Sequence, residues 1–429
     1  MFADLRNRIA HNPFFTSVLI LMSGSVLSQA IPFLASPALG RLYSPNQFAT
    51  YTLFQSTVNI LGVITTLKYD MAIVVAKEDD APSVFWLCMA LSGLLTVVLL
   101  AAAPVAVYLL PWLNKGQGAG WVYLVPFSVF ITGLFSTLDF YNLRLNRYRV
   151  ITNANIVRAL VSAAVQISLA LLGFGVYGLL LGQLLAYFVG DIILASKIIP
   201  HIPRPDKKRI LVVAKEHRDF ARFTMPGTMA TTLSYNLISF FLPSFFRAAE
   251  LGYYSIINQV LSAPLTVISA AVGNVFLKKS SDEAAENRMS AKTFSSVTRV
   301  LTLLAVPVFT VLFLFAEPMI RVFLGKQWVP AAAMVRALTP MFLARFIITP
   351  VTSSAIVAGR QGASMLWQFS LLAASVLPAV VQSIYPLTVL SYLTLLSLLI
   401  AACYIVFYLY CRQLLNHQTK AKLRGKFER

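Results

Sequence analysis

The sequence has few charged residues and no long hydrophilic stretch. Only 12% of its 429 residues are charged, whereas 58% are hydrophobic. Soluble globular domains carry charges at about a quarter of their positions, so this composition excludes an ordinary soluble protein. The polar segments between the apolar runs are too short to form a soluble catalytic domain. The composition therefore indicates an integral membrane protein.

Residues that usually build metal, redox and nucleotide sites are also scarce. Cys88, Cys403 and Cys411 have no metal-binding or redox spacing. The four histidines all lie in predicted loops or tails, and neither His-Glu-x-x-His nor a Gly-x4-Gly-Lys-Ser/Thr phosphate loop occurs. We therefore expect no cofactor, no metal and no ATP hydrolysis by that route. A coupling proton or sodium ion would have to bind a carboxylate.

Apolar segments long enough to cross a bilayer recur along the whole chain. About 20 residues of helix cross roughly 30 Å of hydrocarbon. We predict an all-α integral membrane protein with about twelve transmembrane helices in two six-helix bundles, the first helix being uncleaved rather than a signal peptide. The predicted spans are residues 14–37, 48–67, 83–111, 121–143, 154–172, 176–199, 220–243, 251–277, 297–316, 331–358, 363–383 and 386–411.

Basic residues are unequally distributed between the two sides of this topology. With a cytoplasmic N-terminus, 28 of the 35 Lys and Arg residues lie on the cytoplasmic side, including Arg158 and Arg222, which flank spans. Five lie outside, and the remaining two, Arg336 and Arg345, lie inside the tenth span. Because short cytoplasmic loops favour positive charge, this asymmetry places both termini in the cytoplasm. We interpret the net charge of +19 as this topology signal together with contact to anionic lipids, and expect no nucleic-acid partner.

The longest predicted cytoplasmic connection divides the chain into two halves. We predict an N-terminal six-helix bundle at 1–200, a basic linker at 201–219, a C-terminal six-helix bundle at 220–411 and a basic tail at 412–429. Each half is long enough for six spans of about 20 residues. The linker would then be the natural boundary between two domains.

A weak internal repeat relates the two halves. Phe-Ala-Thr-Tyr at 48–51 aligns with Leu-Gly-Tyr-Tyr at 251–254, and Gln55 aligns with Asn258. Both segments follow an odd-numbered span, so both lie on the same side of the membrane. The repeat is therefore predicted to be parallel, with an axis along the membrane normal, as in some repeat-built transporters.

Arg345 is the strongest candidate for substrate binding. It lies near the middle of the tenth predicted span, where a charge costs roughly 2.5 to 3.5 kcal/mol on insertion scales. Pro340 and Pro350 bracket it, and transporter binding sites often lie at broken helices. We expect Arg345 to face a watery cavity, and a structural ion pair is the alternative.

Three other arginines are weaker candidates for substrate binding. Arg336 precedes Arg345 by nine residues and is close enough to the outer surface for a purely interfacial position. Arg41 and Arg247 follow the first and seventh spans at similar places in the repeat. They would suit the exit of an anionic substrate at the outer mouth, or they are ordinary loop charges.

Two aspartates are candidates for ion coupling. Asp191 lies about 12 Å from the inner end of the sixth span and has no charged residue three or four positions away. Asp70 ends the second span together with Lys68, which is also a candidate for substrate binding; the two form either a gate or a solvated helix end. Asp139 is expected to balance the arginine cluster at 144–149.

Uncharged polar residues deep in the spans offer a path compatible with sugars. Hydrogen bonding between helices is the alternative for each of them and is favoured for any single one. The residues are Gln29, Gln55, Asn59, Asn236, Asn258, Gln259, Asn274 and Gln368.

Several stretches together resemble one known family. They are the segment 226–243, the run AELGYYSIINQVLSAPLTVISAAVGNVFLKKSSDE from Ala249, and the run RLYSPNQFATYTLFQSTVNILGVITTLKYDMAIVVAKEDDA from Arg41. The chain resembles the polysaccharide-biosynthesis flippases of the multidrug/oligosaccharidyl-lipid/polysaccharide exporter superfamily. The resemblance extends over essentially the whole chain.

The resemblance implies a transporter in the bacterial inner membrane and not an enzyme. Such a flippase moves an undecaprenyl-diphosphate-linked oligosaccharide from the cytoplasmic to the periplasmic leaflet by alternating access, in O-antigen, lipopolysaccharide or other surface polysaccharide biosynthesis. A polysaccharide polymerase and a chain-length regulator would be partners. A central cationic cavity would bind the diphosphate, and Arg345, with Arg41, Lys68, Arg247 and Arg336 as weaker candidates, would line it.

Three other functions stay open. An ion-coupled multidrug exporter of the same superfamily would need buried carboxylates for organic cations, whereas Arg345 is a cation. A membrane-embedded polysaccharide-assembly enzyme would need a sizeable outer loop, and the predicted outer loops are short. A scaffold for a biosynthetic complex would tolerate substitutions of the predicted cavity residues.

Overall fold

The chain folds into two helical units in a computed structural model. The structure describes residues 13–109, 118–196, 198–199, 202–203, 206–285, 291–352, 354–357 and 360–427. The N-terminal unit ends at Gly252 and the C-terminal unit begins at Tyr253. No β-strand occurs in these ranges, in agreement with the predicted all-α class.

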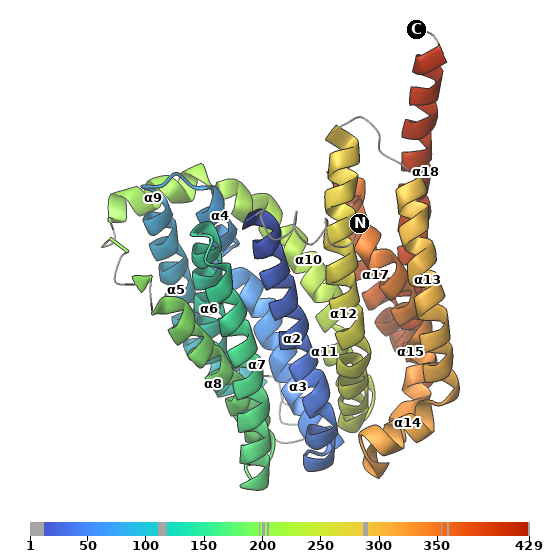
Figure 1. The fold of residues 1–429 in the computed structure, drawn as a ribbon. Helices are drawn as coiled ribbons and strands as arrows, with labels where there is room; N and C mark the ends of the chain where they lie inside the picture. Colours follow the sequence, from blue (N-terminus) through green and yellow to red (C-terminus); the bar gives the residue numbers. More distant parts are fainter. Residues whose placement is uncertain are drawn as a thin grey trace. The chain divides into compact units, whose positions relative to one another are not determined.

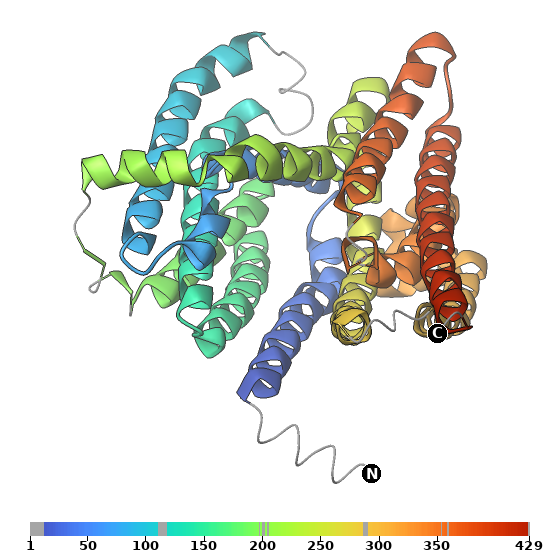
Figure 2. The same ribbon diagram turned by 90° about the horizontal axis from the view of Figure 1, so that it is seen from above.

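Most helices of the N-terminal unit are long and run roughly parallel to one another, with α9 across their ends (Figures 1 and 2). Two short non-α segments, a 3-10 helix at Ala119–Leu124 and a π-helix at Phe220–Thr224, precede α6 and α10. The helices are α2 (Pro13–Leu42), α3 (Pro45–Thr65), α4 (Tyr69–Val75), α5 (Ala81–Leu109), α6 (Val125–Arg144), α7 (Tyr148–Leu171), α8 (Val176–Ala195), α9 (Lys207–Glu216), α10 (Met225–Asn236) and α11 (Ile238–Phe245).

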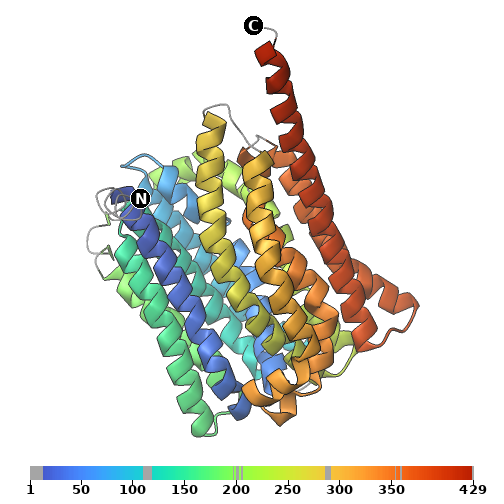
Figure 3. The same cartoon turned by 45° about the vertical axis from the view of Figure 1, so that its right-hand side comes forward.

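The C-terminal unit follows from α12, which begins just before the unit boundary. Short 3-10 helices at Lys326–Trp328 and Thr349–Val351 flank α15. The helices are α12 (Ala248–Ala285), α13 (Ala291–Leu314), α14 (Ala316–Phe323), α15 (Ala331–Ile348), α16 (Ser354–Val357), α17 (Gln361–Ile384) and α18 (Val389–Phe427). In Figure 3, α13 and α18 run in opposite directions along this unit.

The start of α3 shows how the sequence defines a helix end. The Ser44 side chain accepts a hydrogen bond from the Gln47 backbone N–H, and the Gln47 side chain accepts one from the Ser44 N–H. This capping box satisfies two backbone donors that the first turn leaves unpaired. Pro45 occupies the first turn, where its missing N–H costs nothing.

The predicted count of twelve spans is only partly matched. By length and composition, eight helices in the described part of the chain can cross a membrane, or up to nine if the bent pair α3 and α4 forms one span. A helix or helix pair lies at each predicted segment. The predicted seventh span, however, is divided between α10 and α11, each shorter than the bilayer requires. The count of twelve stays a prediction.

The compact units divide the chain later than the predicted linker at 201–219. The helices α10 and α11 pack against α3 in the N-terminal unit. Asn59 of α3 donates a side-chain hydrogen bond to Asn236 of α10 (3.3 Å), and Ser56 donates one to Ser239 of α11 (2.8 Å). For Asn59 and Asn236, hydrogen bonding between helices is thus what the structure shows.

The linker itself contains α9, which packs on α4 and α5. Val213 is fully buried there, and the Tyr69 hydroxyl donates a hydrogen bond to the Ala214 carbonyl (2.9 Å). Arg209 pairs with the buried Asp80 carboxylate at 2.6 Å, and that carboxylate raises the pKa of Arg209. The linker is therefore attached to the N-terminal unit.

Candidate functional site

Arg345 lies among aromatic side chains in the C-terminal unit. Its guanidinium stacks over the Phe342 ring, 5.5 Å from the ring centroid. Tyr254 of α12 interacts electrostatically with Arg345, and Tyr392 of α18 interacts with Tyr254. Both tyrosines are buried, while Arg345 is half-buried. A cation on α15 thus lies near the hydroxyl group of Tyr254 on α12, and both groups can donate hydrogen bonds to an anion.

Arg345 lies nearer to the end than to the start of its candidate span in the described part of the chain. This span runs from Ala331 to Val351, since α15 ends at Ile348 and a 3-10 turn containing Pro350 follows. Arg345 is therefore about 21 Å from Ala331 and about 9 Å from Val351 along the helix. Its predicted position near the midplane of the membrane stays a prediction.

Arg336 does not contribute to the surroundings of Arg345. It is exposed, and its Nε donates a hydrogen bond of 3.2 Å to the Phe313 carbonyl in the last turn of α13. Basic side chains stabilise helix C-termini by satisfying unpaired carbonyls. The contact supports the interfacial position for Arg336.

Lys68 and Asp70 lie at a break in the second predicted span. The helices α3 and α4 meet there at 51°, and the two adjacent residues Leu67 and Lys68 both have positive φ angles. Asp70 is buried and accepts hydrogen bonds from the Met71 backbone N–H (2.9 Å) and the Ser136 hydroxyl (2.5 Å). Among the described residues Lys68 and Asp70 form no ion pair. Asp70 instead fixes the start of α4.

Arg144 closes the other end of α4. It donates hydrogen bonds to the carbonyls of Ile73 (2.7 Å), Val74 (3.3 Å) and Ala76 (2.7 Å). Asp139 was expected to balance the arginine cluster at 144–149, but Arg144 binds these backbone carbonyls instead. An acidic residue at the N-terminus and a basic one at the C-terminus both match the helix dipole.

We expect Arg144→Met to lower the free energy of unfolding by about 1.5 to 3 kcal/mol, because hydrogen bonds to a charged donor are lost. Denaturant titration of the purified protein in mixed micelles would measure it. The exposed Arg218 provides a matched control, and Arg218→Met should leave the unfolding free energy unchanged. Equal stability of both variants would contradict a capping role for Arg144.

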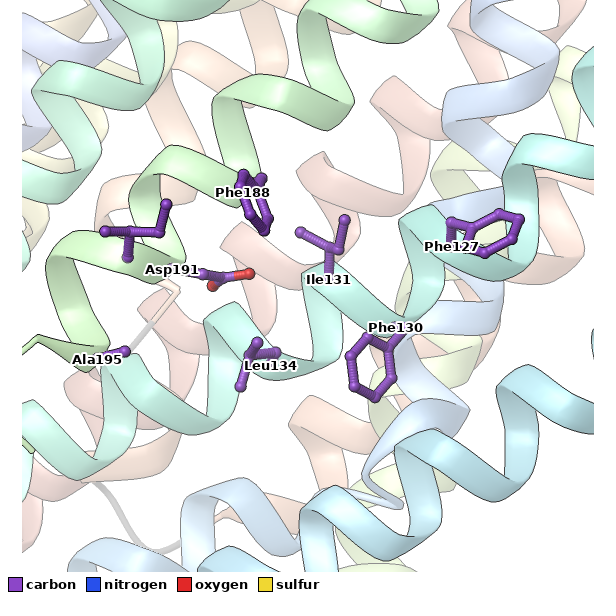
Figure 4. A pocket seen from close by; sticks show the side chains of 8 residues that line it. Phe127, Phe130, Ile131, Leu134, Phe188, Asp191 and Ala195 are labelled. Carbon is purple, nitrogen blue, oxygen red and sulfur yellow. The ribbon is translucent and has the colours of Figure 1, made fainter. Parts of the chain in front are cut away.

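Asp191 projects from α8 into a pocket between α6 and α8 (Figure 4). It is 4% exposed, and neither carboxylate oxygen has a hydrogen-bond partner among the described residues. The pocket has a volume of about 350 Å³ and apolar walls. Its lining residues are Phe127, Phe130, Ile131, Leu134, Phe188, Asp191, Ile192 and Ala195.

Arg158 of α7 supplies the positive charge that acts on the Asp191 carboxylate. It acts on Asp191 and on the half-buried Asp139 of α6. Its guanidinium lies over the rings of Tyr187 (4.5 Å) and Phe135 (5.2 Å). Such cation–π contacts hold a charge where water is scarce. Two carboxylates that share one cation can take up a proton or a small cation.

Gly190 permits this arrangement by lacking a side chain. A Cβ atom at Gly190 would lie 2.8 Å from Cε2 of Phe135, closer than real Cβ contacts allow. The Phe135 ring can therefore pack against α8 while it also lies beneath Arg158. Backbone approach of this kind is a reason for glycine in membrane helices.

The tyrosines at aligned positions of the repeat both lie near an arginine. Tyr51 interacts electrostatically with Arg158 in the N-terminal unit, and Tyr254 interacts with Arg345 in the C-terminal unit. The alignment of residues 48–51 with 251–254 thus places a tyrosine near an arginine in each half of the chain. The sequence predicts Arg158 as a charge flanking its span, whereas the structure places it ten residues, about 15 Å, from the start of α7 at Tyr148.

Arg41 and Arg247 are both exposed, at the end of α2 and immediately before α12. Arg247 interacts electrostatically with Glu250, three residues further along. Exposed charges of this kind contribute little to stability. Their predicted role in substrate exit stays a prediction.

Comparison with known proteins identifies the family. The sequence pattern of the family described as polysaccharide biosynthesis proteins matches residues 38–333. The chain belongs to the polysaccharide biosynthesis protein family. The matched residues begin in α2 and end in the first turn of α15, so they include Asp191 and Arg158 and stop short of Arg345.

Two curated members of polysaccharide pathways are similar to this polysaccharide biosynthesis protein. The succinoglycan biosynthesis transport protein ExoT of Rhizobium meliloti (strain 1021) is 24% identical over 363 residues, which cover 80% of this chain and 69% of ExoT. The teichuronic acid biosynthesis protein TuaB of Bacillus subtilis (strain 168) is 22% identical over 158 residues, 37% of this chain and 33% of TuaB. The match to a transport protein agrees with the prediction that the chain is not an enzyme.

Solved transporter structures share the fold of this family member. An inward-facing multidrug resistance MATE family transporter of the MOP superfamily has a TM-score of 0.68 and 15% identity, covering 93% of this chain and 96% of that one. A MOP superfamily transporter from Pyrococcus furiosus has a TM-score of 0.64 and 16% identity, with coverage of 94% and 96%. The chain is therefore a multi-pass integral membrane protein with a MATE-like fold.

Proposed function

We propose that the protein is a flippase for an undecaprenyl-diphosphate-linked oligosaccharide repeat unit. The lipid-linked sugar would move from the cytoplasmic to the periplasmic leaflet during synthesis of O-antigen or another surface polysaccharide. The observation that carries the proposal is the half-buried Arg345 beside Phe342 and Tyr254 within a family of polysaccharide biosynthesis proteins. A guanidinium and phenolic hydroxyls suit a diphosphate because they supply positive charge and hydrogen-bond donors together.

The proposed mechanism is alternating access, in which the two units change their relative orientation and the lipid tail stays in the bilayer. Twelve spans with both termini cytoplasmic fit this mechanism. Export of an anion across an inside-negative membrane is favourable by about 2.3 kcal/mol per charge per 100 mV. A diphosphate with about two charges would gain roughly 4 to 5 kcal/mol. Return of the empty carrier would then be the uphill step.

Ion coupling is proposed at Asp191, where Arg158 supplies a positive charge that also acts on Asp139. Both Asp191 oxygens lack hydrogen-bond partners among the described residues. Asp70 is the weaker candidate, because both of its oxygens already accept hydrogen bonds. A proton or sodium ion bound at Asp191 would lower its charge and so change its attraction to Arg158.

A multidrug exporter is the second candidate. The MATE-like fold and the buried Asp191 favour it, because organic cations bind to buried carboxylates. The two candidates differ in the side chain that each needs. Export of a cationic dye that Asp191→Asn abolishes and Arg345→Ala leaves intact would support the multidrug exporter and contradict the flippase.

Reconstitution tests the proposed flippase directly. Proteoliposomes would hold a fluorescent undecaprenyl-diphosphate oligosaccharide, and a membrane-impermeant quencher would report the leaflet that it occupies. We expect the protein to move this lipid, and to move the same oligosaccharide on a neutral lipid much more slowly. An electrical potential that draws anions toward the predicted periplasmic side should accelerate the movement.

The outcomes separate the proposed flippase from its rivals. Equal rates for the diphosphate and neutral lipids would contradict recognition of the diphosphate. Absence of movement by folded protein would contradict the flippase altogether. Elongation of the sugar chain by the purified protein would instead show a membrane enzyme. Predicted contacts with a polymerase and a chain-length regulator are a separate question, which this assay leaves untouched.

A further inference from the structure

A second concave site lies in the C-terminal unit, between α13, α15 and α18. It has a volume of about 770 Å³. These three helices lie side by side in the C-terminal unit, with α13 and α18 antiparallel (Figure 3). Arg345 does not line this groove, although its neighbour Ala344 does. The groove is therefore distinct from the site at Arg345.

Most of the groove wall is apolar and faces away from the rest of the unit. Leu303 of α13 and Leu398 and Ile405 of α18 line it and are exposed. Pro340 and Ile347 of α15 form its floor. Exposed apolar side chains within spanning segments contact lipid tails, so the groove offers a surface for a hydrocarbon chain.

Two arginines line the groove at different levels. Arg299 of α13 and Arg412 of α18 both line it and are exposed, and its lining contains no acidic residue. Among the described residues neither guanidinium forms an ion pair. Nearby polar lining includes the hydroxyl residues Ser295 and Thr298. The two arginine positions can therefore bind anions, whereas the apolar wall binds hydrocarbon.

Arg299 and Arg412 are separated along the axis of the two helices. The Phe294 ring of α13 stacks on the Tyr408 ring of α18, with 5.3 Å between centroids, so these residues lie at one level. Arg299 follows Phe294 by five residues and Arg412 follows Tyr408 by four, in antiparallel helices. Their Cα atoms are therefore about 13.5 Å apart along the axis. At this separation each guanidinium can bind a phosphate of its own when their long side chains point toward one head group.

We propose that this groove binds a phospholipid with two phosphates, of the cardiolipin class, at the leaflet predicted to be cytoplasmic. One phosphate would lie at Arg299 and the other at Arg412, while an acyl chain occupies the apolar groove. Basic pockets between membrane helices on the cytoplasmic side bind such head groups. The site goes beyond the proposed flippase function and does not depend on it. A bound lipid would hold α13 against α18.

Native mass spectrometry of the delipidated full-length protein in detergent would test this site. The titrations would use cardiolipin, phosphatidylglycerol, undecaprenyl diphosphate and inorganic pyrophosphate. We expect one tightly bound cardiolipin per chain. Arg299→Gln and Arg412→Gln should each weaken it about fivefold, because one surface arginine contributes about that factor. Arg360→Gln, an exposed arginine outside the groove, should leave it unchanged.

A second kind of variant tests the apolar part of the groove. Ala402→Trp would fill it while both arginines remain, so cardiolipin should bind more weakly. Melting temperatures without lipid should match the wild type for every variant used. Cardiolipin binding that is equal in all variants would overturn the site. Arginine-dependent binding of undecaprenyl diphosphate in preference to cardiolipin, or of pyrophosphate alone, would overturn the proposed occupant.

Discussion

Arg345→Ala is expected to reduce flipping of the diphosphate-linked oligosaccharide about tenfold to a hundredfold in proteoliposomes. This range corresponds to a lost charged hydrogen bond of about 1.5 to 3 kcal/mol. Arg345→Lys should retain an intermediate rate, because lysine keeps the positive charge and loses the planar group that binds two phosphate oxygens. The order wild type, Lys, Ala would identify Arg345 as a cationic anchor in the transport path.

The control for Arg345 lies on the same helix. Arg336 also carries a positive charge on α15, yet it is exposed and its guanidinium donates to the Phe313 carbonyl. Arg336→Ala should therefore flip lipid at nearly the wild-type rate. The amount of monodisperse folded protein must be equal for all variants before rates are compared.

Two other results would contradict a transport role for Arg345. Rates equal to the wild type in both Arg345→Ala and Arg345→Lys would reduce Arg345 to a structural residue beside Phe342 and Tyr254. An equal loss of flipping rate in Arg336→Ala and Arg345→Ala would show that the total charge of α15 matters and that the particular position of Arg345 does not.

The sequence predicted the helices better than their interruptions. Apolar length alone predicts a spanning helix, because the bilayer sets the number of residues needed. The end of α15 also had a signal, since Pro350 follows Ile348. The break between α3 and α4 had none. Leu67 and Lys68 adopt positive φ angles there, although side chains other than glycine rarely do.

The sequence predicts single residues of the candidate sites but not the residues that surround them. Arg345 and Asp191 stand out in sequence because charges are rare inside apolar segments. Their neighbours come from other helices, so no local pattern reveals them. The sequence predicts Arg158 as a flanking charge, because the start of α7 at Tyr148 lies six residues before the predicted span at 154–172. The cap that Arg336 provides for α13 likewise depends on packing between two helices.

Arg158→Met is expected to cause a substantial loss of stability. Asp139 and Asp191 would then keep two carboxylates in a largely apolar setting without the cation that acts on both. Removing one partner of a direct buried ion pair costs about 3 to 5 kcal/mol, and we expect no more than the lower value, because Arg158 is half-buried and makes no direct ion pair with Asp191 among the described residues. Denaturant titration would measure it. Arg149→Met, an exposed change on the same helix, should have little effect.

A double-mutant cycle then separates structural from coupling roles in this cluster. Arg158→Met together with Asp191→Asn should recover part of the lost stability, because the amide removes one unbalanced charge. Additive effects would show that Arg158 and Asp191 do not interact.

Asp191→Asn alone is expected to fold and to abolish the dependence of flipping on pH or sodium. If Asp191→Asn reproduces the wild-type rates across a full pH and sodium series, Asp191 is not the coupling residue, and its role is confined to balancing Arg158.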